Sequence, residues 1–236
     1  MKHVEVWLLD RLVPGADPER LEALLTPEER KRRDRFRRAE DQDRFRLGRA
    51  LSRTVLARRL GRPPASIGLE VGPVGRPTVA DAPDGPWFSI SHSGDLVVLA
   101  VAPTPEVGVD VEREDRALDV PRLAAKVCTP AERAVLAASS AADLTHRFCA
   151  MWTLKEAYAK ATGLGLELDP AHLGFNPDLP GLVEQLGGLP PAEAAAWRFR
   201  LWRPVPGYSL ALAFKPPAGD GLAVRGPLSA AALFKA

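Results

Sequence analysis

The sequence predicts an α+β fold, in which short strands and helices follow one another along the chain. Its 236 residues, 46% hydrophobic and 26% charged, have the composition of one large globular domain or two small ones. Several short runs alternate apolar and polar side chains, which is typical of strands because successive side chains point to opposite faces. The pattern Thr-Pro-x-Glu occurs at Thr26 and again at Thr129, and it predicts two capped helix starts.

The first hundred residues are predicted to contain strands over residues 3–9, 67–71, 87–91 and 96–102. Helices are predicted over residues 19–25 and over residues 27–60, the second with a break near Ala39 and an end at Gly61. Between them, Gly75-Arg76-Pro77 has the composition of a turn, where the backbone can approach a ligand closely.

The helical segment from Arg30 to Arg49 is strongly basic, with ten cations against four acids. One interpretation is a solvated helical face, where charge runs usually belong. Another is a site for phosphates or for an acidic partner, because arginine binds phosphate in a bidentate manner. Nucleic acid is a third interpretation, but aromatic residues are sparse here and no nucleic-acid-binding motif occurs.

Three hydrogen-bonding side chains, Ser91, His92 and Ser93, follow the apolar start of the strand at Phe88. A hairpin turn accounts for the glycine after them, but it does not account for the three polar residues. Phosphate binding and a purely structural histidine are both open interpretations at this point.

The segment from Gly108 to Glu112 predicts a short buried strand that carries two acids. Asp110 and Glu112 share one face of it, roughly 6–7 Å apart, and such carboxylates repel each other unless a positive charge lies nearby. Mg²⁺ is a common solution, because carboxylates and phosphate oxygens are its preferred ligands. A structural strand with one solvated face would have the same pattern.

The second half is predicted to contain helices over residues 121–127, from Thr129 onward and over residues 143–162, then strands over residues 173–175, 197–202 and 208–214. The longest helix contains Trp152, Lys155, Glu156 and Lys160. Glu156 and Lys160 form either an ordinary surface pair or part of a site. Residues 217–236 are expected to form a loosely attached tail.

Four motifs in this order resemble the 4′-phosphopantetheinyl transferases of the surfactin-synthetase type. They are Gly75-Arg76-Pro77, the segment from Phe88 to Ser93, the segment from Gly108 to Glu112 and the segment from Trp152 to Lys160. The resemblance covers roughly residues 26–166. It implies that the phosphopantetheine arm of coenzyme A passes to a serine of an apo acyl or peptidyl carrier protein, with release of adenosine 3′,5′-bisphosphate, so that the enzyme is a holo-[carrier protein] synthase.

The resemblance also implies two similar α/β halves related by a pseudo-twofold axis. Each half would have a small antiparallel sheet packed on a long helix, and the active site would lie in the cleft between them. The expected boundaries are 1–103 for the half that contacts the 3′-phosphate and adenine, 104–216 for the half with the metal and the catalytic helix, and 217–236 for the tail.

The family's functional residues can be carried over to this sequence. The resemblance implies that Asp110, Glu112 and Glu156 bind Mg²⁺, or Mn²⁺ in its place. It implies that Glu156 and Lys155 are catalytic, as the base for the serine and as the cation on the pyrophosphate. The expected coenzyme A contacts are Arg32, Arg44, Gly75, Arg76, Pro77, Ser91, His92 and Lys155. Glu132 matches an acid near the family's site, and Glu29 stands where the family pattern has a lysine.

Two other functions use the same residues. A divalent-metal nuclease or phosphodiesterase would use the acids and a lysine, but its usual acid-x-lysine order is not met. A catalytically silent carrier-binding module would be expected to lose an acid or Lys155. The two cysteines lack metal-ligand spacing and no apolar run approaches membrane length, so the sequence predicts a cytoplasmic protein without a membrane partner. No nucleic-acid partner is expected, because no binding motif for one occurs, and the resemblance implies a monomer.

Overall fold

The computed structural model describes residues 3–12, 17–72, 75–114, 117–176, 178, 184–217 and 221–234. The chain forms two compact units, and each is described by itself. Unit 1 consists of Met1–Pro105 together with Leu222–Ala236, and unit 2 consists of Glu106–Gly221.

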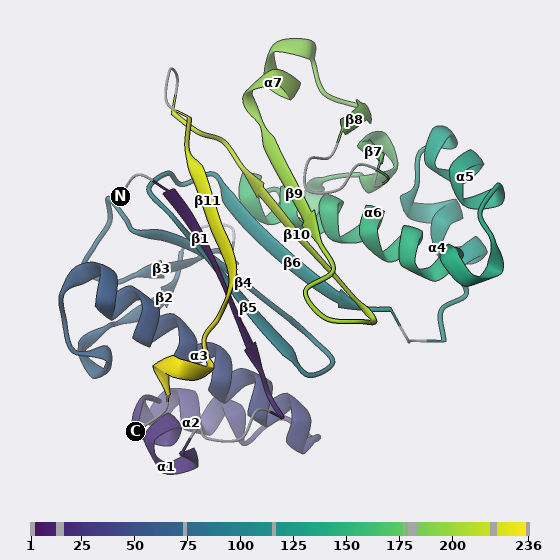
Figure 1. Cartoon of the computed structure of the whole chain (residues 1–236). Helices are drawn as coiled ribbons and strands as arrows, with labels where there is room; N and C mark the ends of the chain where they lie inside the picture. The colour runs from purple at the N-terminus through teal and green to yellow at the C-terminus, as the bar shows by residue number, and fades with distance from the viewer. Residues whose placement is uncertain are drawn as a thin grey trace. The chain divides into compact units, whose positions relative to one another are not determined.

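Unit 1 is a four-stranded sheet with helices and a small hairpin. Its strands are β1 (His3–Asp10), β2 (Leu69–Val71), β3 (Pro77–Val79), β4 (Trp87–Ser93), β5 (Leu96–Ala102) and β11 (Ala223–Ser229). Its helices are α1 (Pro18–Ala23), α2 (Pro27–Arg33) and α3 (Ala39–Leu60), with short 3₁₀ turns at Pro64–Ser66 and Ala231–Leu233. The main sheet has the order β11-β1-β5-β4, and β2 pairs with β3 (Figure 1).

Unit 2 is built in the same manner. Its strands are β6 (Val107–Arg113), β7 (Gly174–Asn176), β8 (Glu184–Gly187), β9 (Arg198–Trp202) and β10 (Tyr208–Phe214). Its helices are α4 (Val120–Val127), α5 (Pro130–Ala137), α6 (Ala141–Thr162) and α7 (Pro191–Ala196), with 3₁₀ turns at Gly165–Glu167 and Pro170–His172. The main sheet has the order β6-β10-β9, all antiparallel, and β7 pairs with β8.

The two units share most of one order of elements. In each, a strand is followed by three helices, a two-stranded hairpin and two strands, with α7 inserted before the two strands in unit 2. The second of these two strands pairs with the first strand of its unit, in β1-β5-β4 and in β6-β10-β9. The third helix of each unit, α3 or α6, has 22 residues and packs on the sheet of its own unit. The expected α+β fold with two similar halves is confirmed, whereas the expected cleft between them stays a prediction.

The helix boundaries follow from local chemistry. Thr26 and Thr129 each accept a hydrogen bond from the backbone of the glutamate three residues on, and each glutamate accepts one in return, so both predicted capping boxes form. The long helices end where Gly61 and Gly163 adopt the left-handed conformation, with φ of 65° and 76°. The predicted helix break near Ala39 is the non-helical segment 34–38.

The expected loose tail is wrong for the residues described. β11 pairs in parallel with β1, and Ala230 and Phe234 lie in the apolar core of unit 1. The sheet of unit 1 is therefore mixed rather than wholly antiparallel. Gly226 and Pro227 within β11 hid this strand in the sequence, because both residues are unfavourable in strand interiors. The strand covers the edge of β1, which would otherwise have unpaired backbone groups.

No helix in the described ranges combines the length and the apolar character that a membrane span requires.

In unit 2, β6 and α6 approach each other at a single glycine. A Cβ atom on Gly108 would lie 1.9 Å from the carbonyl oxygen of Ala157 and 2.5 Å from the amide nitrogen of Ala161. No side chain fits there without moving the helix. Gly108 therefore sets the distance between the acidic strand and the longest helix, and it explains why a glycine precedes the two acids.

We expect Gly108→Ala to lower both stability and activity, because the added methyl must push α6 away from β6. Overpacking of this kind costs about 1–3 kcal/mol. The measurement is thermal unfolding, together with turnover at a temperature where the variant is folded. Gly221→Ala is the control, since a Cβ atom there meets nothing within 4 Å. Native stability and native turnover in Gly108→Ala would contradict the close contact.

Candidate active site

The acidic face of β6 lies against α6. Gly108, Asp110 and Glu112 alternate with Val109 and Val111, whose side chains are buried on the opposite face of the strand. Asp110 is itself buried and lies opposite Ala211 of β10, while Glu112 lies opposite Ser209. The strand thus directs the carboxylates of Asp110 and Glu112 to the side of the sheet on which α6 packs.

The helix α6 contributes an acid and a cation to the same place. Lys160 Nζ donates to Asp110 Oδ1 at 2.6 Å. Burial raises the pKa of Glu156, the negative charges of Asp110 and Glu112 raise it further, and Lys160 opposes them. The three acids predicted as metal ligands therefore influence one another, as expected from the sequence, and Lys160 lies among them.

This donor set fits a hard divalent cation in its chemistry. Carboxylate oxygens are the ligands that Mg²⁺ prefers, and three acids in one place favour a positive charge. Among the residues that the structure describes, however, no group of three His, Cys, Asp or Glu side chains is close enough to hold a metal ion. The ammonium of Lys160 supplies positive charge to Asp110 in this arrangement.

Lys155 does not join this group. Its side chain is 1% exposed, and its ammonium donates to Glu132 Oε2 at 2.7 Å, to the carbonyl of Val127 at 2.8 Å and to the carbonyl of Pro170 at 2.7 Å. An ammonium has three protons, and all three are used. The expectation that Lys155 contacts the pyrophosphate of coenzyme A stays a prediction.

Lys155 and Glu156 separate because they are neighbours on a helix. Consecutive helical residues lie about 100° apart around the axis, so one can face β6 while the other faces α5. Lys160 follows Glu156 by four residues and lies on the same side as Glu156. The sequence left open whether Lys160 pairs with Glu156 at the surface or belongs to a site, and it did not predict the contact with Asp110. The spacing i, i+4 from Glu156 was the signal that could have found it.

The residues expected to bind the 3′-phosphate lie on neighbouring elements of unit 1. Arg44, near the start of α3, donates to the carbonyl of Gly94 at 2.6 Å and pairs with Asp41. Gly94 lies in the hairpin between β4 and β5, two residues after His92, which is exposed. Arg32 is exposed on α2, with its guanidinium over the ring of Phe45, 5.5 Å from the centroid.

The other predicted contacts of coenzyme A also belong to unit 1. Gly75-Arg76-Pro77 forms the return of the β2–β3 hairpin, where Gly75 has a φ of 77° and the carbonyl of Arg76 accepts from Gly72 at 2.7 Å. β3 in turn contacts β4, the strand that contains Ser91, and Ser91 is mostly buried. The β2–β3 hairpin therefore lies beside the strand that contains Ser91 and His92.

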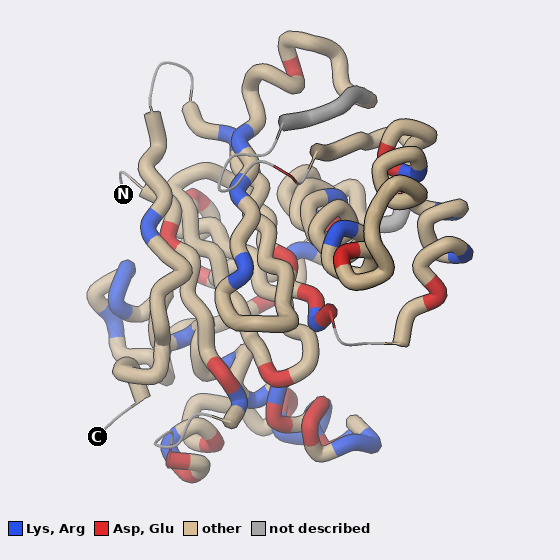
Figure 2. Tube along the Cα trace, turned by 45° about the vertical axis from the view of Figure 1, so that its right-hand side comes forward, with Lys and Arg blue, Asp and Glu red and all other residues tan. Residues whose placement is uncertain are grey.

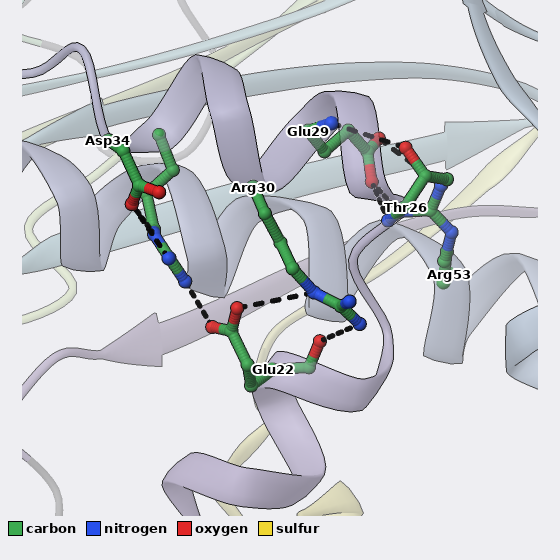
Figure 3. A network of polar contacts seen from close by, with 7 residues as sticks. Glu22, Thr26, Glu29, Arg30, Asp34 and Arg53 are labelled. Atoms are coloured by element: carbon green, nitrogen blue, oxygen red, sulfur yellow. Dashed lines mark hydrogen bonds and ion pairs between the residues drawn. The ribbon is translucent and has the colours of Figure 1, made fainter.

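Glu29, where a family lysine was expected, has a structural position. Its carboxylate completes the capping box of α2 and accepts from both Nη atoms of Arg53, at 2.8 and 3.2 Å (Figure 3). Arg53 is 2% exposed and was not singled out from the sequence. Figure 2 shows charges of both signs along α1 to α3, and many of these cations are paired, as Arg33 is with Glu22 and Asp34. Acids thus neutralise part of the basic segment, since Arg30, Arg33, Arg44, Arg46 and Arg49 are each paired with an aspartate or a glutamate.

Comparison with known proteins decides the family. Residues 106–213 match the model of the 4′-phosphopantetheinyl transferase superfamily, and residues 16–104 match that of the 4′-phosphopantetheinyl transferase N-terminal region. A phosphopantetheinyl transferase of Thraustochytrium sp. is 34% identical over 92% of this chain and 81% of its own length. The chain belongs to the 4′-phosphopantetheinyl transferase family.

Two further relatives support the assignment. The 4′-phosphopantetheinyl transferase HetI of Nostoc sp. is 31% identical over 77% of this chain and 78% of its own. The 4′-phosphopantetheinyl transferase Sfp of Bacillus subtilis is 29% identical over 89% of this chain and 90% of its own. The protein is thus an enzyme of the holo-[carrier protein] synthase class, and its family implies coenzyme A and carrier proteins as substrates. The resemblance stated from the four motifs is confirmed at the level of the family.

The raised pKa of Glu156 in this transferase predicts a pH-dependent stability. A carboxyl that holds its proton more tightly when folded makes folding less favourable once it ionises. The loss begins as pH rises past the ordinary value of 4.5 and is complete above the folded pKa. We therefore expect Glu156→Gln to be more stable than the native protein at pH 7 without divalent metal, and we expect the difference to disappear below pH 4.5.

The measurement is thermal unfolding in EDTA across this pH range. Glu193→Gln is a control of opposite sign, because hydrogen bonds from Trp197 and Lys215 lower the pKa of Glu193. That variant should lose stability at pH 7. A Glu156→Gln protein less stable than the native one at pH 7 would show that the acidic cluster is not under repulsion.

Proposed function

We propose that this enzyme transfers the 4′-phosphopantetheine arm of coenzyme A to a carrier-protein serine with the help of Mg²⁺ or Mn²⁺ held in unit 2. The observation that supports it is the contact of Lys160 with Asp110, together with the negative charges of Asp110 and Glu112 that raise the pKa of Glu156. These groups can receive a divalent cation and a pyrophosphate, whereas a carrier-binding module would need neither. The resemblance to the surfactin-synthetase type, and the match to Sfp, agree with this proposal.

The acids of unit 2 are assigned two tasks, metal binding and proton transfer. Asp110, Glu112 and Glu156 would hold the metal, which supplies positive charge to the pyrophosphate when it is bound. Glu156 accepts the proton of the serine hydroxyl, directly or through water. Its raised pKa suits this task, because a base works best when its pKa lies closer to the working pH.

The transfer itself forms one bond and breaks another. The serine oxygen attacks the phosphorus that bears the pantetheine arm, and the bond from that phosphorus to the bridging oxygen breaks. Adenosine 3′,5′-bisphosphate leaves with the electron pair of that bond. We assign the cation for the leaving phosphate to Lys160 rather than to Lys155, since Lys160 is partly exposed and close to Asp110.

Unit 1 is assigned the nucleotide end of coenzyme A. Arg32, Arg44 and His92 would bind the 3′-phosphate, with Ser91 as a further phosphate contact, and the backbone of Gly75-Arg76-Pro77 would contact adenine. Arg32 is the best candidate for a dominant contact, because its guanidinium is exposed and held in place by the ring of Phe45.

The finer expectations about the cell and the assembly are proposals as well. We propose a cytoplasmic monomer that acts without nucleic acid or membrane. Neither Cys128 nor Cys149 is in a disulfide, in agreement with a reducing compartment.

The metal assignment predicts that Asp110→Asn abolishes transfer, because the buried carboxylate is both a ligand and the partner of Lys160. The native enzyme should also lose activity in EDTA and recover it with Mg²⁺. The measurement is the intact mass of an apo carrier protein after incubation with coenzyme A. Glu167→Gln is the control, since Glu167 is an exposed acid of the same unit. Full transfer in EDTA or in Asp110→Asn would overturn the assignment.

The 3′-phosphate assignment predicts that dephospho-coenzyme A is a poor substrate, mainly through a raised KM. A charge-assisted hydrogen bond contributes roughly 1.5–3 kcal/mol, so Arg32→Ala should raise KM for coenzyme A by roughly ten- to a hundred-fold. Arg32→Ala should then change little with dephospho-coenzyme A. Arg58→Ala, an exposed position on α3, is the control. Equal use of both substrates by the native enzyme would assign these arginines to another task.

A further inference from the structure

A buried ion pair joins five elements of unit 2. Glu132 and Lys155, on α5 and α6, have side chains that are 0% and 1% exposed. Glu132 accepts from Thr129 within the capping box and, through Oε1, from the backbone of Phe175 in β7 at 3.0 Å. Lys155 donates to the carbonyl of Val127, the last residue of α4, and to that of Pro170 in the 3₁₀ turn after α6. The pair therefore satisfies backbone groups of the segments that surround α6.

Unit 1 contains the same device. Glu29 of its capping box accepts from Arg53 of its long helix, and Arg53 Nε donates to the carbonyl of Ile67 at 3.0 Å, again after that helix has ended (Figure 3). Arg53 occupies the same position along α3 as Lys155 does along α6, in helices of 22 residues each. A capping-box glutamate paired with a buried cation of the long helix is thus a shared part of the two halves.

The residue after the cation differs between the units. In unit 2 it is Glu156, whereas in unit 1 it is Thr54. Because adjacent helical residues are about 100° apart, fixing one of them fixes the direction of the next. The pair in unit 2 therefore fixes the rotation of α6 about its axis, and with it the direction of Glu156 toward Asp110 and Glu112.

We propose that Glu132 and Lys155 are positioning residues, which hold Glu156 in its place over β6 and do not themselves touch coenzyme A. Glu29 and Arg53 are their structural counterparts in unit 1, without an acid to position. The proposal rests on the proposed function in that Glu156 is taken as the reacting acid. In this proposal Lys155 fixes the position of Glu156, and it neither binds nor protonates a phosphate of coenzyme A.

The direct test compares Lys155→Met with the native enzyme. Loss of the ammonium leaves Glu132 buried without its cation and lets α6 rotate, and a misplacement of about 1 Å can cost about 100-fold in rate. We expect kcat to fall by about 100-fold. The affinity for coenzyme A, measured by calorimetry, should stay near native, because the variant retains Asp110 and Glu156. We also expect weaker binding of Mn²⁺ in the presence of coenzyme A, measured by electron paramagnetic resonance.

The matched control is Arg53→Met in unit 1. It removes a cation of equal burial from the equivalent pair and should lower the melting temperature as Lys155→Met does. It should keep the native kcat at saturating coenzyme A and the native Mn²⁺ binding. If both variants lose kcat in proportion to their loss of stability, the pair in unit 2 is only structural and the proposal is wrong.

Lys155→Arg decides the case even if Lys155→Met does not fold. A guanidinium fills the equivalent position in unit 1, so it can bind Glu132 and the carbonyl of Pro170 in the same way. If Lys155 is a positioning residue, Lys155→Arg should keep most of the native kcat. If Lys155 bound or protonated the leaving phosphate, Lys155→Arg would lose most of the native kcat together with affinity for coenzyme A, and that result would overturn the proposal.

The proposed function fails separately. Glu156→Gln in the same assay should lose turnover whether or not Lys155 has a positioning role. If Glu156→Gln retains full turnover while Lys155→Met loses it, then Glu156 is not the reacting acid, and the assignment of the pair as its positioning device is overturned with it. If Glu156→Gln is inactive and Lys155→Met is fully active, only the positioning proposal is wrong.

Discussion

The close contact between β6 and α6 determines how the acids of the strand lie relative to Glu156 and Lys160 of the helix. At Gly108 the backbone of the strand touches the backbone of the helix, so neither element can shift without the other. Asp110 and Glu112 follow Gly108 on the same face, and Glu156 and Lys160 lie on the helix that this face meets. This backbone contact thus brings Asp110 and Glu112 near enough to Glu156 to raise its pKa, although the strand and the helix are far apart in the sequence.

Repulsion among the carboxylates opposes this arrangement, and the contacts that fix α6 hold the acids together against the repulsion. Burial and two neighbouring carboxylates make ionised Glu156 unfavourable, while Lys160 offsets part of the effect. Such a cluster persists because α6 is fixed on several sides, by Gly108 at the strand and by Lys155 at α4, α5 and the turn at Pro170. The repulsion among the acids favours a positive charge beside them, and the ammonium of Lys160 supplies one to Asp110.

The two units use one scaffold for different chemistry. Both have a capping box with a buried ion pair, a 22-residue helix and three neighbouring antiparallel strands. In unit 2 the first strand carries Asp110 and Glu112 and the long helix carries Glu156, whose charges influence one another, whereas unit 1 has exposed and half-buried arginines on α2 and α3. Function therefore depends on a few side chains placed on a repeated fold, and the fold alone does not imply it.

The sequence by itself determined the local structure and the family. Strands followed from alternation, helix starts from Thr-Pro-x-Glu, helix ends from glycine, and the three acids from motifs, because each signal lies within a few consecutive residues. Only the tertiary structure decided that Lys155 is buried while Lys160 meets Asp110, that Glu29 pairs with Arg53, and that β11 joins β1. These facts depend on contacts between residues far apart in the chain, and no local pattern specifies which buried partner a charged side chain will meet.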